Sequence, residues 1–214
     1  MFGAGALTDE VVCAAAAGSR ADIAHVLEAL QPQVRLMVAA RLSPRPAQLD
    51  AVDEISQEVM LGLTTGMARL ENRTVDGLRG YLSGIVMRQV ASALQRRGPG
   101  GPGRSERSLD STVASFSHAG PLWQFLSASG TSLCTTVDRA ELTERLISAL
   151  GRLHEQQREI VTLAFFDQLP VSEIARQQGI SRAASSMLLL RAVQTLRRSM
   201  TSSSDAEKEH GSCI

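Results

Sequence analysis

The residues from Ser172 to Ala192 read SEIARQQGISRAASSMLLLRA, a spacing that predicts two short helices joined by a tight turn. Gly179 can take the left-handed conformation that ends the first helix, and Ser181 is a favourable N-cap for the second. This is the layout of a helix-turn-helix, whose second helix enters the major groove of DNA. The second helix carries few groups for base recognition, because Arg182 and Arg191 are separated by small residues and leucines. An ordinary helical hairpin with a glycine C-cap would give the same pattern, so the motif alone leaves both interpretations open.

The composition limits the class of protein that carries this motif. Of the 214 residues, 43% are hydrophobic and only 3% aromatic. Ala, Leu and Val predominate, with many Arg, Gln and Glu between them, and this mixture favours helix over strand. We therefore expect an all-α protein. The 22 basic and 22 acidic residues cancel, whereas a free-standing DNA-binding protein is usually basic. Any nucleic-acid role must depend on local patches or on a partner.

The cysteines do not have the spacing of a metal site or of a disulfide framework. Cys13, Cys134 and Cys213 are scattered, with no CxxC pair and no paired histidines, so we expect no metal, no cofactor and a reducing environment. The apolar run VVCAAAAG, residues 11–18, is too short to span a bilayer and follows two acidic residues. We expect a cytoplasmic protein without membrane insertion.

The chain divides by composition into two helical blocks and a connector. Residues 1–97 have helical periodicity, residues 98–137 begin with GPGGPG and are rich in Ser, Thr and Gly, and residues 138–200 are periodic again. A phosphate-binding loop is the alternative for GPGGPG, but the preceding strand and the Gly-Lys-Ser/Thr ending are absent. Residues 201–214 are polar and predict a disordered tail. We expect two small helical domains joined by a flexible linker, with the helix-turn-helix in the C-terminal one.

The run from Leu146 to Arg198 resembles the C-terminal domain of bacterial RNA polymerase sigma factors, in particular the extracytoplasmic-function (ECF) group of the sigma-70 family. The matching residues are Leu150, Leu153, Gln157, Arg158, Glu159, Leu163, Glu173, Ile174, Ala175, Gly179, Ile180, Ser181, Leu189, Arg191, Ala192 and Leu196. In that family the domain binds the minus-thirty-five element of promoters. The resemblance therefore implies DNA contacts at this element from Ser181, Arg182, Ser185, Ser186 and Arg191.

The second helix of the motif departs from the family pattern. His154 stands where the family usually has Pro, and residues 183–188 stand where Gly-Thr-Val-Lys-Ser-Arg is usual. Ser185 thus replaces an apolar core residue, while Ser186 and Leu188 replace polar or basic ones. Because the leucines at 188–190 cannot all face DNA, we expect at least two of them to pack inward. We expect weak promoter contact that relies on backbone positioning and DNA shape.

The N-terminal block resembles the other domain of the same family. The segment Val52–Leu63 is similar to the helix that docks on the clamp helices of the polymerase, although the solvated face of any amphipathic helix would have the same charge spacing. The implied docking residues are Glu54, Gln57, Glu58 and Leu61. The loop Glu71–Gly80 corresponds to the one that captures a flipped base, and Tyr81–Arg97 to the helix that approaches the minus-ten element. The implied contacts at this element are Asn72, Arg73, Thr74, Arg79, Tyr81, Arg88, Arg96 and Arg97.

Both resemblances occur in the family's order, so the chain is identified as an ECF-type sigma factor. This implies a protein that is not an enzyme, binds core RNA polymerase and promoter DNA, and helps to open the minus-ten element. An anti-sigma factor is a further partner that the resemblance suggests. Two alternatives are a stand-alone helix-turn-helix regulator and a helical adaptor without DNA function. The adaptor is favoured by the departures at Ser185, Ser186, Leu188 and Arg88.

Overall fold

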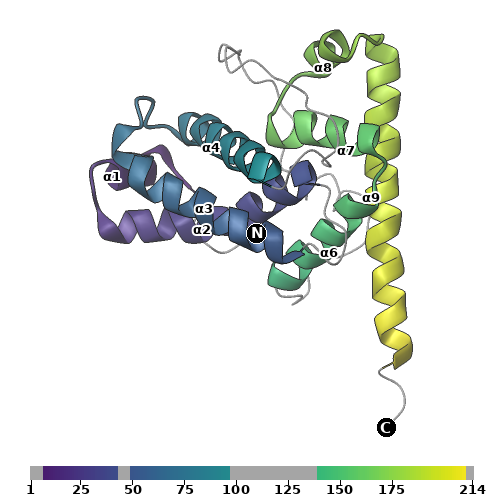
Figure 1. The fold of residues 1–214 in the computed structure, drawn as a ribbon, viewed down its shortest axis with the longest axis horizontal. Helices are drawn as coiled ribbons and strands as arrows, with labels where there is room; N and C mark the ends of the chain where they lie inside the picture. Colours follow the sequence, from purple (N-terminus) through teal and green to yellow (C-terminus); the bar gives the residue numbers. More distant parts are fainter. Residues whose placement is uncertain (1–6, 43–48, 97–138, 211–214) are drawn as a thin grey trace. The chain divides into compact units, whose positions relative to one another are not determined.

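The computed structural model describes residues 7–42, 49–96 and 139–210, shown as coloured ribbon in Figure 1. Every regular element in these three ranges is a helix, which confirms the predicted all-α class. The helices form two compact units, each with its own core. The predicted linker, residues 98–137, lies outside the described residues.

The first unit is built around a pair of long helices. Its elements are α1 (Asp9–Ala16), α2 (Arg20–Leu42) up to Val38, α3 (Leu49–Gly66), the 3-10 turn η2 (Met67–Arg69) and α4 (Val75–Arg96). Helices α3 and α4 pack against each other through fully buried aliphatic side chains. These include Val52, Ile55, Val59 and Leu63 on α3 and Leu78, Leu82, Ile85 and Val86 on α4. Their spacing of three and four residues gives each helix one apolar face.

The start of α4 is fixed by two side chains. The Oγ1 atom of Thr74 accepts a hydrogen bond from the backbone N–H of Gly77 at 3.1 Å, as an N-cap does. The carboxylate of Asp9, in the first turn of α1, accepts a hydrogen bond from the N–H of Val75 at 2.7 Å. A negative charge at this position also interacts favourably with the positive end of the α4 helix dipole. Helix α1 therefore holds α4, and the loop before it, in place.

The second unit packs three shorter helices against one long helix. Its elements are α6 (Arg139–Arg152), α7 (Glu155–Val161), the π-helical turn η3 (Thr162–Phe166), α8 (Val171–Gln178) and α9 (Arg182–His210). Helices α6, α7 and α8 all contact α9, the long yellow helix of Figure 1. The core contains Leu150, Leu153, Ile160, Leu163, Ile174, Ala192 and Leu196.

Helix α9 extends beyond the predicted end of the domain. Residues 201–210 continue the helix, so the prediction of a disordered tail from residue 201 is wrong for this part. The segment lacks apolar periodicity, but its Ala, Glu and Lys residues have high helix propensity and extend a helix that the core has already nucleated. Residues 211–214 lie outside the described part of the chain.

Candidate nucleic-acid interface

The turn between α8 and α9 has the geometry that the sequence predicts. Gly179 has φ 66° and ψ 27°, the left-handed conformation that glycine adopts without a steric cost. The N–H of Ile180 donates to the carbonyl of Ala175 at 3.1 Å, which closes the end of α8. The Oγ atom of Ser181 accepts from the N–H of Ala184 at 3.1 Å and so caps the start of α9. The second unit therefore contains a helix-turn-helix.

Four of the five residues predicted to contact the minus-thirty-five element are accessible. Ser181, Arg182, Ser186 and Arg191 are all exposed, at the start of α9 and on its first turns. In a helix-turn-helix these turns are the ones that reach base edges. These four side chains are therefore accessible to a partner molecule, and their contact with DNA stays a prediction.

Ser185 is the exception, because its side chain is 0% exposed. It lies seven residues before Ala192 and eleven before Leu196, and this helical spacing places all three on the face toward the core. Its hydroxyl oxygen has no hydrogen-bond partner among the described residues. The prediction that Ser185 contacts DNA is therefore wrong: Ser185 occupies an interior position of the unit.

Two of the three leucines at positions 188–190 turn toward the interior, as expected, and the third belongs to an exposed apolar surface that was not predicted from the sequence. Leu188 and Leu189 are half-buried, whereas Leu190 is 49% exposed. Met187 is also 49% exposed, and Ala183 is exposed one turn before it. The signal that would have found this surface is the spacing of 183, 187 and 190, which follows one face of a helix turned away from Ser185.

Helix α8 carries an arginine held by its own helix. Arg176 is exposed, and its guanidinium donates to the carboxylate of Glu173 at 2.9 Å through Nε. This hydrogen bond, together with one from Gln177, holds the pKa of Glu173 below its usual value. Glu173 is thus ionised at neutral pH and fixes the direction of the arginine. In a helix-turn-helix the first helix crosses the DNA backbone, where such a cation is suited to a phosphate.

Arg158, by contrast, supports the scaffold. Its side chain is buried and donates to the carbonyl of Leu153 at 3.1 Å, near the end of α6. Burial lowers the pKa of the guanidinium, although an arginine remains charged at any physiological pH. Arg158 therefore fixes the junction of α6 and α7 and does not face a ligand.

In the first unit the predicted base-capturing loop is ordered by contacts within itself. Thr74 caps α4 and donates a hydrogen bond to the side-chain oxygen of Asn72 at 2.9 Å. A Cβ atom at Gly77 would overlap the backbone oxygen of Asn72, so glycine is needed for the loop to turn back against α4. Asn72 and Arg73 remain exposed.

The predicted residues on α4 have different environments. Arg88 is exposed, whereas Arg79 is half-buried and forms an ion pair with Asp76 at 3.4 Å. The hydroxyl of Tyr81 lies against Gly66, at the end of α3, where no Cβ atom would fit. Tyr81 therefore joins α4 to α3 through close packing. Arg97 lies outside the described residues.

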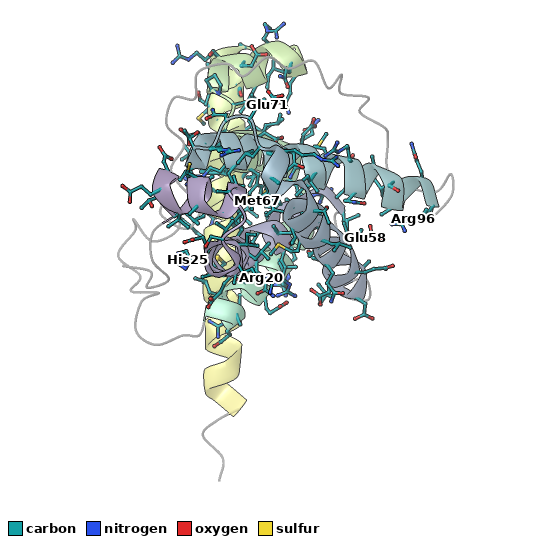
Figure 2. The ribbon with its side chains drawn as sticks, turned by 90° about the vertical axis from the view of Figure 1, so that its left-hand side faces the viewer. Arg20, His25, Glu58, Met67, Glu71 and Arg96 are labelled. Carbon is teal, nitrogen blue, oxygen red and sulfur yellow. The ribbon has the colours of Figure 1, made fainter. Side chains whose placement is uncertain are left out.

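The docking residues predicted on α3 share an exposed strip. Glu54, Gln57 and Leu61 follow each other at helical spacing, and Leu61 is 66% exposed. Glu58 is half-buried and accepts two hydrogen bonds of 3.2 Å from the guanidinium of Arg96, at the end of α4 (Figure 2). A predicted polymerase contact and a predicted DNA contact are thus paired with each other.

Two further findings concern the described ranges alone. They contain no cluster of His, Cys, Asp and Glu side chains that could hold a metal ion. None of their helices is both long enough and apolar enough to cross a membrane.

The fold and this surface define a two-unit helical protein with a helix-turn-helix of the DNA-binding type. Residues 143–196 match the family model "Sigma-70, region 4". The chain is 27% identical to the ECF RNA polymerase sigma factor SigD of Mycobacterium tuberculosis (strain ATCC 25618 / H37Rv) over 197 residues, 92% of this chain and 85% of SigD. It is 47% identical over 53 residues to the ECF RNA polymerase sigma factor BldN of Streptomyces coelicolor, which is 25% of this chain and 20% of BldN.

A solved structure, that of CnrH in complex with the cytosolic domain of CnrY, aligns with a TM-score of 0.41. The identity is 17%, and the alignment covers 93% of this chain and 97% of that chain. The family model and the two curated relatives support an ECF sigma factor of the sigma-70 family, a class of protein that directs RNA polymerase to promoters.

Proposed function

We propose that the second unit of this sigma factor contacts the minus-thirty-five element of its promoters and that the first unit contacts the minus-ten element. The protein acts in the cytoplasm by binding and without catalysis of its own. The observation that carries the proposal is the exposure of Arg182, Ser186 and Arg191 on the first turns of α9, behind a well-formed turn at Gly179. Arg182 and Arg191 supply positive charge for phosphates at both ends of this surface.

The loop before α4 supplies the second half of the mechanism. Asn72 is both exposed and oriented by Thr74, which suits a side chain that must hydrogen-bond an extruded base. Extruding a base costs a few kcal/mol, which contacts available only to the unpaired base can offset. Arg73 and Arg88 are exposed and suited to the backbone of the separated strand. Binding energy of this kind would drive opening of the minus-ten element.

The strip on α3 provides a surface for core RNA polymerase. Glu54 and Gln57 offer polar groups, and Leu61 places an apolar side chain in the same exposed row. Leu61 is 66% exposed, so burying it against a partner would be favourable. The polar residues around it would orient the contact. A protein that covered this strip would prevent docking, and an anti-sigma factor of that kind is a further partner that we propose.

In-vitro transcription tests the proposed function. Core polymerase with this protein, on fragments of the source genome, is expected to start at sites that core polymerase alone does not use. The double variant Arg182→Ala, Arg191→Ala is expected to lose those starts, because both phosphate contacts disappear. The matched control is Arg20→Ala, Arg152→Ala, which removes two exposed arginines outside the proposed contacts.

Each alternative function gives a different outcome. The absence of new start sites with the unaltered chain would overturn the proposal. Full activity of Arg182→Ala, Arg191→Ala would favour a helical adaptor, and tight operator binding without polymerase would favour a stand-alone regulator.

A further inference from the structure

The accessible face of α9 is more apolar than expected of a surface that recognises bases through hydrogen bonds. Met187 and Leu190 are each 49% exposed, and Ile180 is 37% exposed in the turn. Three of the five exposed large apolar residues in the described ranges thus lie in the turn or on this helix, the others being Leu49 and Leu61 on α3. Core packing does not explain Met187 and Leu190, because the interior side of the helix is occupied by Ser185, Ala192, Val193 and Leu196.

The two arginines lie on either side of this apolar strip. Arg182 and Arg191 are nine residues apart, about two and a half helical turns, so they project from opposite sides of α9. Leu190 lies between them around the helix, and Ala183, Ser186 and Met187 are the other exposed residues there. Cations at both edges of an apolar strip match a groove that has phosphates on both sides and something apolar at its floor.

The small residues allow the helix to approach that floor closely. Ala183, Ala184 and Ser186 are exposed and carry at most one heavy atom beyond Cβ. Leu190 has no hydrogen-bonding group and the thioether of Met187 is only a weak acceptor, so neither is suited to reading base edges by hydrogen bonds. The apolar group that B-DNA presents in its major groove is the C5-methyl group of thymine.

We propose that Met187 and Leu190 determine promoter specificity by contacting thymine methyl groups in the minus-thirty-five element. The proposal rests on the proposed function, because it requires α9 to lie in the major groove. The strip of Met187 and Leu190 thereby recognises A·T pairs through the methyl group of thymine. Arg182 and Arg191 position the helix on the backbone, and the two apolar side chains supply the discrimination.

Deoxyuridine in place of thymidine tests the proposal, because it removes the C5-methyl group and keeps every hydrogen-bonding group of the base. Binding of the holoenzyme is measured on a promoter identified by in-vitro transcription, with all thymidines of the minus-thirty-five element on both strands replaced. We expect affinity to fall by about fourfold for each contacted methyl group, the value for burying one methyl or methylene group. The uracil template is expected to start transcription at the same site, at reduced occupancy.

Variants of the protein show which side chain meets the methyl group. Met187→Ala and Leu190→Ala are each expected to weaken binding to the thymine template and to lose part of the sensitivity to uracil. The reason is that the alanine substitution and the loss of the methyl group remove the same contact. Leu49→Ala, which truncates an exposed leucine on α3, is the matched control and is expected to keep full sensitivity to uracil. Circular dichroism of each variant confirms that α9 remains folded.

Two results would overturn the proposal. One is equal affinity of the unaltered holoenzyme for the thymine and uracil templates. The other is an equal loss on uracil for the unaltered chain, Met187→Ala and Leu190→Ala. In either case, continued initiation from the same site would leave the proposed function intact, whereas the proposed function fails when neither template supports initiation.

Discussion

At the scale of single residues, Ser185 is a buried structural residue within a helix whose exposed neighbours are the candidate DNA contacts. Its hydroxyl is buried without a partner, and an unsatisfied buried hydroxyl lowers stability by roughly 1–3 kcal/mol. Ser185→Ala removes this group with little loss of volume. We expect it to raise the free energy of unfolding by about 1 kcal/mol, measured by chemical denaturation.

The control for this prediction is the neighbouring Ser186→Ala, on the exposed side of α9, which should change stability by less than about 0.5 kcal/mol. A Ser185→Ala variant less stable than Ser186→Ala would contradict the account. It would mean that the Ser185 hydroxyl is satisfied in solution.

Sequence reasoning placed Arg182, Ser186 and Arg191 among the accessible residues of α9 and misplaced Ser185. The helix-turn-helix was predictable because Gly179 and Ser181 act locally, through backbone conformation and capping. Ser185 was assigned to DNA contact by its polarity, although it stands where the family has an apolar core residue and its spacing from Ala192 and Leu196 indicates the interior. The strip of Met187 and Leu190 was missed because the expectation concerned how many leucines pack inward, and the helical face shared by positions 187 and 190 was not considered.

At the scale of elements, the crossing of α3 and α4 depends on a glycine. A Cβ atom at Gly66 would overlap the hydroxyl and ring of Tyr81, so an alanine must push the two helices apart or displace the ring. We expect Gly66→Ala to lower the free energy of unfolding by about 1–3 kcal/mol, the usual cost of overpacking. Thermal or chemical unfolding of the full chain measures this effect.

A second substitution shows whether the tyrosine is the cause. In the Gly66→Ala background, Tyr81→Ala removes the overlapping ring. Tyr81→Ala should therefore lower the free energy of unfolding less in this background than in the unaltered chain. Independent, additive effects of the two substitutions would argue against the close contact between α3 and α4.

Contacts between helices were the part of the first unit that sequence could not provide. The exposure of Glu54, Gln57 and Leu61 follows from helical periodicity within α3. The ion pair of Glu58 with Arg96 joins residues 38 positions apart, and the capping of α4 by Asp9 spans 66 positions. Such pairings depend on how the helices pack, which a single sequence pattern does not specify.

At the scale of the whole molecule, the absence of net charge is central to the account. With 22 basic and 22 acidic residues, the chain lacks the overall field that gives a DNA-binding protein high intrinsic affinity. Two weak DNA-contacting units joined to polymerase benefit instead from effective concentration, since each binding event makes the next one intramolecular. Promoter recognition should therefore depend on polymerase.

The most direct measurement is the affinity for labelled promoter duplex, by fluorescence anisotropy at physiological salt, with and without core polymerase. The account predicts a dissociation constant of about micromolar or weaker for the chain alone, the range of non-specific binding. It predicts about nanomolar or tighter for the complex with core polymerase. Nanomolar binding by the chain alone, unchanged by polymerase, would contradict the central claim.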